Sequence, residues 1–483
     1  LFRMFHIRLF IFNLIRGLNV AKRLLRQYFS QVFRFLQKKN IITSFLHIIN
    51  TFMPRKNIIL YTEILLALLA LLIMAFVLPG TGDEGDSVTH YLISKYAFEM
   101  PHNFFDHWGK PLFVLFSTCF AQFGFVGIKI FNVLSTTTAI YFACRTAQLL
   151  KIPNVQLLPV ILFFSPMYII LTLSGLTEPF SAAVLMVGIY LLIANKTTAG
   201  VILLSFLPFI RSEGLVILGI ITVYLLYNKQ WRLLPLLAIG HLVYAIAGYP
   251  EYHSLLWVFS KIPYGTLSSE HYGSGDFLYF VNNFHFIMGY VVKWLIGLGF
   301  IYPLIAIYQQ YVKTEKKQVI VSAEVLLIYG IFSAFFVAHT LFWYLGIFNS
   351  MGLIRVFIGV APLMALIALC GFNAFISVVK ENSMLNNLLF IALIGYIILF
   401  PFTPNPSAIH FKKDLMAREE KLQALRVVEK IKTIKKVDLP LMYNHYYLGI
   451  VLDNDRFDSS ERIPLLKSEL KNLKSGGIVI WDN

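Results

Sequence analysis

Apolar runs long enough to cross a lipid bilayer recur along most of this chain, and the first, residues 58–78, contains a single charged residue, Glu63. A helix needs about 20 apolar residues to span the hydrocarbon core, and lipid leaves helix as one of only two backbone structures that can cross it. Charged residues make up only 14% of the chain, against about 25% in soluble domains. These features exclude a cytosolic enzyme, a disordered protein and a disulfide scaffold.

The sequence therefore predicts an all-α polytopic membrane protein. We expect about 11 transmembrane helices, in a membrane domain covering residues 58–403. Their approximate positions are 58–78, 127–148, 155–175, 179–195, 198–210, 214–228, 233–249, 281–308, 318–338, 352–377 and 386–403.

The excess of positive charge indicates how the chain is oriented in the membrane. The chain has 41 Lys and Arg against 25 Asp and Glu, and 11 of the basic residues lie in residues 1–57, which contain no acid. Basic flanks stay in the cytoplasm. We therefore expect the N-terminus inside, membrane lipids as partners, and no nucleic-acid partner.

Residues 1–57 allow two interpretations. They could form a basic amphipathic helix on an anionic membrane face. Alternatively, much of the segment is not native protein, because Met53-Pro54-Arg55-Lys56 directly before the first span looks like a true start with a short basic flank.

The segment 111–125 decides the topology, because its length of about 15 residues is short for a crossing. If it lies at the membrane surface, residues 80–126 form one outer loop and five later basic turns fall inside. We adopt this topology. It places the C-terminus outside, where residues 404–483 change character. Helical charged stretches near 414–436 and 463–474 and strand-like runs at 439–444 and 478–481 predict a small α/β region there.

The first outer loop carries the densest polar patch, Thr81-Gly82-Asp83-Glu84-Gly85-Asp86. Glycines beside the acids permit tight turns that project carboxylates toward a ligand. Asp86 is expected to cap the following helix, with His90 one turn on. A solvated turn with a helix cap is the alternative interpretation. The three cysteines show no metal-ligand spacing.

Further charges gather at the same predicted face, where charges at span ends are functional candidates. Glu178 lies at an outer turn, and Arg211 and Glu213 lie in a break between two short runs. The two acids could instead neutralise Arg211. Arg355 has the stronger functional case, because no acid lies near it in sequence.

An outward site with loop carboxylates and cations at the membrane suits transfer from a lipid-linked sugar phosphate. Arg or Lys can hold the phosphate, and a carboxylate can accept the proton of an attacking hydroxyl. Soluble nucleotide donors are generally unavailable outside the cytoplasm, so the sugar would arrive on a lipid.

The succession Gly82-Asp83-Glu84, the helix at 91–97 and Trp108-Gly109-Lys110-Pro111-Leu112-Phe113 resembles the first outer loop of GT-C glycosyltransferases. The pattern is closest to the protein O-mannosyltransferase and aminoarabinose-transferase type, although the second Pro of its W-x-K-P-P-L-like segment is missing here. Arg211-Ser212-Glu213-Gly214 looks like the Arg-x-Glu-Gly break of many such proteins. The resemblance covers residues 58–230.

The resemblance implies a bacterial inner-membrane enzyme whose site faces the periplasm. It would transfer a mannose-like hexose or a pentose from a polyprenyl phosphate, with inversion, to a protein, lipid or glycan hydroxyl. Asp83 would be the base, with Glu84 supporting it or binding acceptor. The remaining candidates would bind donor phosphate or substrate: Arg211, Arg355, Lys110, His107, Trp108, Asp86, His90, Glu178 and Glu213.

Such enzymes mostly need no cofactor, although the Asp83-x-x-Asp86 spacing leaves room for a divalent ion, as in GT-C oligosaccharyltransferases. Two other functions remain open. A transporter or flippase of lipid-linked glycans would more often show repeat symmetry and paired mid-membrane charges, and neither is visible in the sequence. The third is a catalytically inactive membrane scaffold.

Overall fold

The computed structural model describes residues 55–83, 85–263, 273–313, 325–378, 383–417, 419–434, 441–452, 462–473 and 477–481. The chain divides into two compact units, residues 1–62 and 63–483. Residues 1–54, which hold most of the predicted amphipathic helix, lie outside the described residues, as does Glu84. Both predictions therefore stay untested.

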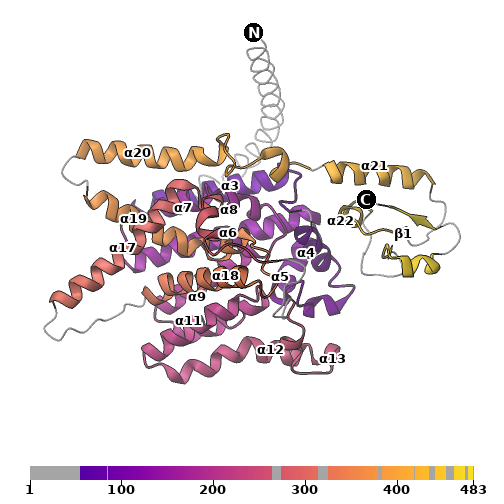
Figure 1. The fold of residues 1–483 in the computed structure, drawn as a ribbon, viewed down its shortest axis with the longest axis horizontal. Helices are drawn as coiled ribbons and strands as arrows, with labels where there is room; N and C mark the ends of the chain where they lie inside the picture. The colour runs from indigo at the N-terminus through magenta and orange to yellow at the C-terminus, as the bar shows by residue number, and fades with distance from the viewer. Residues whose placement is uncertain are drawn as a thin grey trace, which may run out of the picture. The chain divides into compact units, whose positions relative to one another are not determined.

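Four helical stretches among the described residues are long and apolar enough to cross a membrane (Figure 1). They are Ile58–Val77 within α3 (Arg55–Val77), α6 (Gly124–Leu149), Val325–Leu345 ending in α18 (Ile331–Leu345), and Ile354–Ser377, which is mostly α19 (Ala361–Val378). The chain is an integral membrane protein with a predominantly helical fold.

Two of the predicted spans are broken helices. The run 155–175 forms α7 (Leu157–Phe163) and α8 (Pro166–Thr172), because Pro166 has no N–H to continue α7. The run 281–308 bends by 118° at Gly289, whose φ of 85° suits glycine. The two breaks meet, since the Ser165 hydroxyl donates to the carbonyl of Ile287.

The bend separates α15 (Tyr279–Asn283) and α16 (His285–Met288) from α17 (Tyr290–Lys313). If this bent pair crosses as one unit, up to five crossings follow from length and composition. The predicted total of about 11 spans stays a prediction.

The remaining apolar helices are shorter. Among them, α5 has 11 residues and rises only about 16 Å at 1.5 Å per residue, which is too short to cross. These helices are α5 (Pro111–Ala121), α9 (Glu178–Ile193), α10 (Thr197–Leu204), α11 (Gly214–Tyr227), α12 (Ile239–Ala247) and α20 (Ser383–Leu399).

Short helical turns join these elements. They are η1 (Pro101–Phe105), η2 (Leu207–Phe209), η3 (Trp231–Ala238), α13 (Tyr249–Tyr252), α14 (Trp257–Ser260), η4 (Val325–Gly330), η5 (Ile354–Val360), η6 (Phe400–Phe402) and η7 (Phe411–Leu415).

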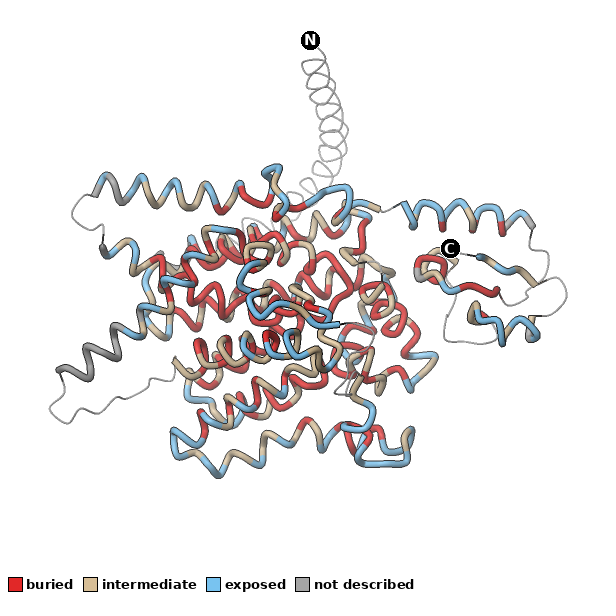
Figure 2. The backbone as a smooth tube through the Cα atoms, in the orientation of Figure 1, coloured by how far each residue is buried: buried red, intermediate tan, exposed pale blue. Residues whose placement is uncertain are grey.

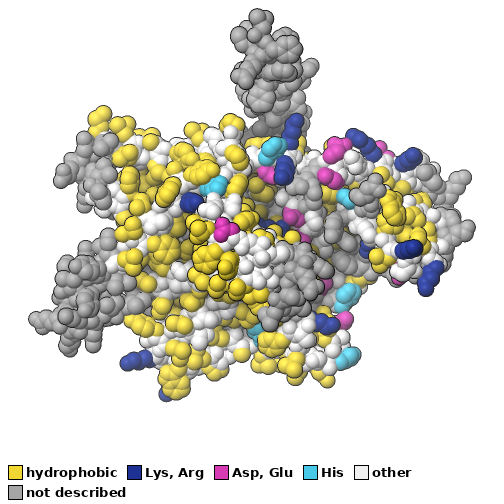
Figure 3. Space-filling model, viewed as in Figure 1, with side chains coloured by type: hydrophobic (Ala, Val, Ile, Leu, Met, Phe, Trp, Pro, Cys, Tyr) yellow, Lys and Arg dark blue, Asp and Glu magenta, His cyan; other side chains and the backbone are white. Residues whose placement is uncertain are grey.

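The helix α9 lies in the interior and is buried on most of its surface (Figure 2). It packs against α6, α10 and η5. This position explains why Glu178, the first residue of α9, is only 1% exposed. On the face shown in Figure 3, hydrophobic side chains cover much of the helical part, as expected of a surface that contacts lipid.

The C-terminal region combines helices with a small sheet. It contains α21 (Glu419–Ile434), β1 (Leu441–Met442), α22 (Tyr446–Leu452), β2 (Arg462–Ile463), η8 (Lys467–Asn472) and β3 (Ile478–Val479). The strands are parallel in the order β2-β1-β3, with Leu441 opposite Arg462 and Ile478. The sequence pattern located β1 and β3 but neither α22 nor β2.

Candidate active site

The acidic loop, residues 79–86, joins α3 to α4 (Asp86–Lys95). Its conformation is fixed locally: the Thr81 hydroxyl donates to the Asp83 carbonyl at 2.9 Å, and the Asp83 side chain accepts the Ser87 N–H at 3.2 Å. The prediction that Asp86 caps this helix is wrong. Asp86 is already the first helical residue, and Asp83 satisfies an N–H of the first turn from outside.

Arg355, which lies far from the acidic loop in sequence, forms ion pairs with two of its carboxylates. It is the second residue of η5, and its Nη1 donates to Asp83 Oδ2 at 2.7 Å while its Nη2 donates to Asp86. No acid lies near Arg355 in sequence, and its two acidic partners come from a distant part of the chain. Both acids precede Arg355 by about 270 residues.

A second arginine lies beside the first. The Nη1 of Arg211 is 2.8 Å from Oε1 of Glu178, and its Nη2 donates to Glu213 at 2.8 Å. Thr177 also accepts a hydrogen bond from Arg211, at 3.3 Å. The neutralising interpretation of both glutamates agrees with this geometry. Glu178 also lies 3.6 Å from Arg355 Nε, so it joins the two arginines into one cluster.

Lys110 completes what we call the charged cluster. Its Nζ donates to the Ser212 hydroxyl at 3.5 Å, next to Arg211 and Glu213. Burial lowers the pKa of Lys110 to about 8, with the charge of Glu213 acting in the opposite direction. Burial raises the pKa of Glu213, but the charges of Arg211, His339 and Lys110 and a backbone hydrogen bond together outweigh burial and leave that pKa at about 2. The cluster comprises three cations, Lys110, Arg211 and Arg355, and four carboxylates, Asp83, Asp86, Glu178 and Glu213.

The predicted substrate-binding aromatic residues are packed beside this cluster. His90 is 6% exposed and stacks on Trp108 with 4.8 Å between ring centroids. Burial, followed by the charges of Lys110, Arg355 and Arg211, lowers the pKa of His90 to about 3. The imidazole is therefore neutral at ordinary pH.

His107 occupies a similar environment. Its ring lies 5.2 Å from that of Trp257, and burial with the charge of Lys110 lowers its pKa to about 4. His90, His107 and Trp108 thus lie in aromatic contacts around the loop that carries Lys110, and their substrate-binding role stays a prediction.

Among the described residues, four buried polar atoms of the cluster have no hydrogen-bond partner: Glu178 Oε1 and Oε2, Arg211 Nε and Arg355 Nε. Glu178 Oε1 is nevertheless ion-paired with both arginines. Burying such an atom unpaired costs about 1–3 kcal/mol. Unused N–H donors on two adjacent guanidinium groups suit an anionic ligand with several acceptor oxygens.

Sequence reasoning missed the hydrogen bonds of the Ser87 hydroxyl, which connect the acidic loop to Gly175. Ser87 is fully buried, and its hydroxyl donates to the Thr81 carbonyl at 2.7 Å and accepts the Gly175 N–H at 2.6 Å. A Cβ on Gly175 would lie 2.3 Å from the Ser87 carbonyl oxygen, so only glycine fits there. The sequence signal for this contact is a glycine, Gly175, just before the predicted outer turn at Glu178.

A divalent ion between Asp83 and Asp86 stays a prediction. Both carboxylates contact Arg355 instead. Within the described part of the chain, no group of three or more His, Cys, Asp or Glu residues could hold a metal ion.

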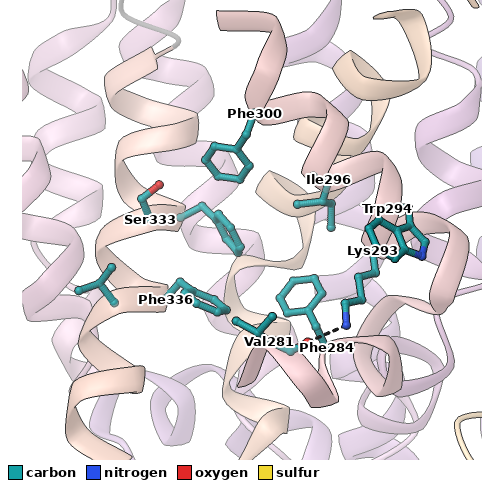
Figure 4. A pocket seen from close by; sticks show the side chains of 11 residues that line it. Val281, Phe284, Lys293, Trp294, Ile296, Phe300, Ser333 and Phe336 are labelled. Atoms are coloured by element: carbon teal, nitrogen blue, oxygen red, sulfur yellow. Dashed lines mark hydrogen bonds between the residues drawn. The ribbon is translucent and has the colours of Figure 1, made fainter. Parts of the chain in front are cut away.

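A separate apolar pocket of about 380 Å³ lies among α15, α17 and α18. Figure 4 shows Phe284, Phe300 and Phe336 around it, with Lys293 at one side donating to the Val281 carbonyl at 2.7 Å. None of its lining residues belongs to the charged cluster.

Comparison with known proteins finds a likeness in structure only. No family model matches the chain, and no curated protein matches it. Among solved structures, it is similar to the crystal structure of ArnT from Cupriavidus metallidurans bound to undecaprenyl phosphate. The identity is 13% and the TM-score 0.53, over 82% of this chain and 84% of that chain. The likeness therefore extends well beyond residues 58–230, where the sequence motifs lie.

Proposed function

Since the chain has the fold of the GT-C membrane glycosyltransferases, we propose that it transfers a sugar from a polyprenyl phosphate to an acceptor hydroxyl. The observation that carries this proposal is the contact between Asp83 and Arg355 inside a cluster of three cations. It puts a carboxylate that can serve as a base beside groups that can bind a phosphate. The similar structure was solved with undecaprenyl phosphate bound, which supports this class of donor.

The cations would hold the donor. Within the described part of the chain, the Nε–H groups of Arg211 and Arg355 have no hydrogen-bond acceptor, and guanidinium groups bind phosphate through paired hydrogen bonds. Lys110 would add a point charge. As the sugar–phosphate bond breaks, its electron pair stays on the phosphate oxygen, and these cations stabilise that added charge.

Asp83 would accept the proton of the acceptor hydroxyl while the oxygen of that hydroxyl forms the new bond to the anomeric carbon. Attack from the face opposite the leaving phosphate inverts that carbon. General base catalysis contributes about 10²–10⁴-fold. We further propose that the donor is a mannose-like hexose or a pentose, that the acceptor is a hydroxyl of a protein, lipid or glycan, and that the site faces the periplasm from a bacterial inner membrane.

The test is transfer in proteoliposomes. We would supply radiolabelled undecaprenyl-phosphate mannose or aminoarabinose together with lipid, glycan and peptide acceptors. We expect labelled product from the wild type and at least about a 100-fold loss for Asp83→Asn. The matched control is Glu251→Gln, which changes an exposed carboxylate on α13 and should keep full activity.

Two results would contradict the proposal. Full transfer by Asp83→Asn would remove Asp83 from the base role. Movement of the donor lipid between leaflets, with no transfer from either donor to any acceptor, would favour a flippase.

A further inference from the structure

The C-terminal region reaches back to the acidic loop at three successive residues. Leu415 accepts the Gly80 N–H through its carbonyl at 2.9 Å. Lys421 Nζ donates to the Pro79 carbonyl at 2.9 Å. The hydroxyls of Tyr447 and Thr81 are 2.8 Å apart. Residues more than 330 positions later in the chain therefore bind the loop just before Asp83.

The direction of the last hydrogen bond follows from proton counting. A threonine hydroxyl has one proton, and that of Thr81 goes to the Asp83 carbonyl. Tyr447 must then be the donor to Thr81. The result is a chain from Tyr447 through Thr81 to the backbone of Asp83. Both hydroxyl-bearing residues are under 5% exposed, so water competes little for these bonds.

Apolar packing brings the same two regions together. Val88, Tyr91 and Leu92 on α4 share one buried cluster with residues of the C-terminal region: Ala424, Val428, Ile431, Leu441, Tyr443, Tyr447 and Leu448. The helix α4 carries Asp86 at its start and His90 in its second turn. The C-terminal region thus buries one side of α4 while Asp86 contacts Arg355.

A second lysine secures the start of the loop. Lys129 on α6 is 2% exposed, and its Nζ donates to the Leu78 carbonyl at 2.6 Å. Together with Lys421 it satisfies the carbonyls that follow α3, where cations are favoured by the helix dipole. The loop is therefore held at Leu78 and Pro79 by lysines and at Gly80 and Thr81 by the C-terminal region.

We propose that the C-terminal region is a positioning element for the catalytic loop and that Tyr447 is its positioning residue. The proposal rests on the proposed function. Tyr447 touches neither substrate nor reacting atoms in this scheme. It acts by holding Thr81, and through Thr81 the backbone of Asp83, so that the Asp83 carboxylate stays against Arg355.

The test compares Tyr447→Phe with Tyr443→Phe, which removes a hydroxyl from the same buried cluster without touching Thr81. We expect Tyr447→Phe to lower kcat about three- to tenfold, the effect of one lost hydrogen bond, with the donor KM unchanged. Tyr443→Phe should leave both constants near those of the wild type. Thr81→Ser keeps the hydroxyl and should keep kcat.

A double variant separates positioning from general destabilisation. If Tyr447 works through Asp83, then Asp83→Asn with Tyr447→Phe should be no slower than Asp83→Asn alone. A multiplicative loss in the double variant would overturn the proposal, as would unchanged kcat in Tyr447→Phe.

Hydrogen exchange of a peptide covering residues 79–87 gives a readout that needs no activity. Faster exchange in Tyr447→Phe but not in Tyr443→Phe is expected, and equal exchange in both would overturn the positioning role. If exchange responds as expected but the wild type transfers no sugar, the proposed function fails while the contact between the two regions stands.

Discussion

Lys110 combines a strained backbone with an unusual titration. Its φ is 68°, a conformation that costs a non-glycine residue about 1–3 kcal/mol, and it directly precedes Pro111 at the start of α5. Its pKa is lowered to about 8 by burial. The ammonium group is therefore charged below about pH 8 and loses its proton above it.

This titration predicts how donor binding depends on pH. Only the charged form of Lys110 attracts a phosphate, so the donor KM of the wild type should rise as the pH passes above about 8. In Lys110→Arg the side chain stays charged, and the donor KM should stay nearly constant between pH 7 and 9.5. Steady-state kinetics with undecaprenyl-phosphate mannose would show this difference. A constant wild-type KM across the range would contradict it.

The residues of the charged cluster could be predicted from sequence, but their pairing could not. Costly charges at the ends of apolar runs identify Asp83, Glu178, Arg211 and Arg355 without a structure. Local spacing also indicates the Arg211–Glu213 pair, two residues apart. The pairing of Arg355 with Asp83 depends on how distant helices pack, and one sequence holds no local signal for a contact across 272 residues.

At the scale of elements, the start of α9 places one buried carboxylate, that of Glu178, in ion pairs with two arginines. Glu178 is 1% exposed and lies between two guanidinium groups. Removing one partner of a buried ion pair costs about 3–5 kcal/mol, because the remaining charge stays buried. Glu213 contacts only one of the two arginines among the ion pairs described.

We therefore expect Glu178→Gln to lower thermal stability more than Glu213→Gln does. Unfolding of both variants in detergent can be followed by tryptophan fluorescence, with Glu251→Gln as an exposed control. The order should be Glu178→Gln least stable, then Glu213→Gln, then the control near wild type. Equal stability of the two buried variants would show that Glu178 does not hold both arginines.

Breaks in the helices were partly predictable. Arg211 and Glu213 interrupt an apolar run with charges, and the structure has η2 and α11 on either side of them. The breaks at Pro166 and Gly289 lie within predicted spans, where hydropathy hides them. A proline or glycine within such a run is a weak signal, because neighbouring helices often satisfy the freed backbone groups.

At the scale of the whole molecule, the charge distribution predicts which loops share a side. We expect His102→Cys, in the outer loop, and Lys229→Cys, in a predicted cytoplasmic turn, to react with a membrane-impermeant thiol reagent from opposite faces. Both positions are exposed. The background should carry Cys119→Ser, because Cys119 is also exposed. Reaction of both cysteines from one face would overturn the topology.

The C-terminal region shows where sequence patterns stop being informative. Its strand-like runs predicted an α/β region beyond the last span, and β1 and β3 lie within them. Nothing in the pattern indicated that Tyr447 would contact Thr81, because both belong to stretches whose partners are set by tertiary packing.

The pairing of Arg355 with Asp83 also has a consequence for biosynthesis. At about 5–20 residues per second, roughly 14–54 s of translation separate the two residues. During that interval the newly made acidic loop holds carboxylates without Arg355, and the ribosome has yet to produce Tyr447. The site thus matures late, after about three quarters of the chain has been made, so a nascent chain interrupted before Arg355 would lack the cation that pairs with both carboxylates however well its first helices had folded.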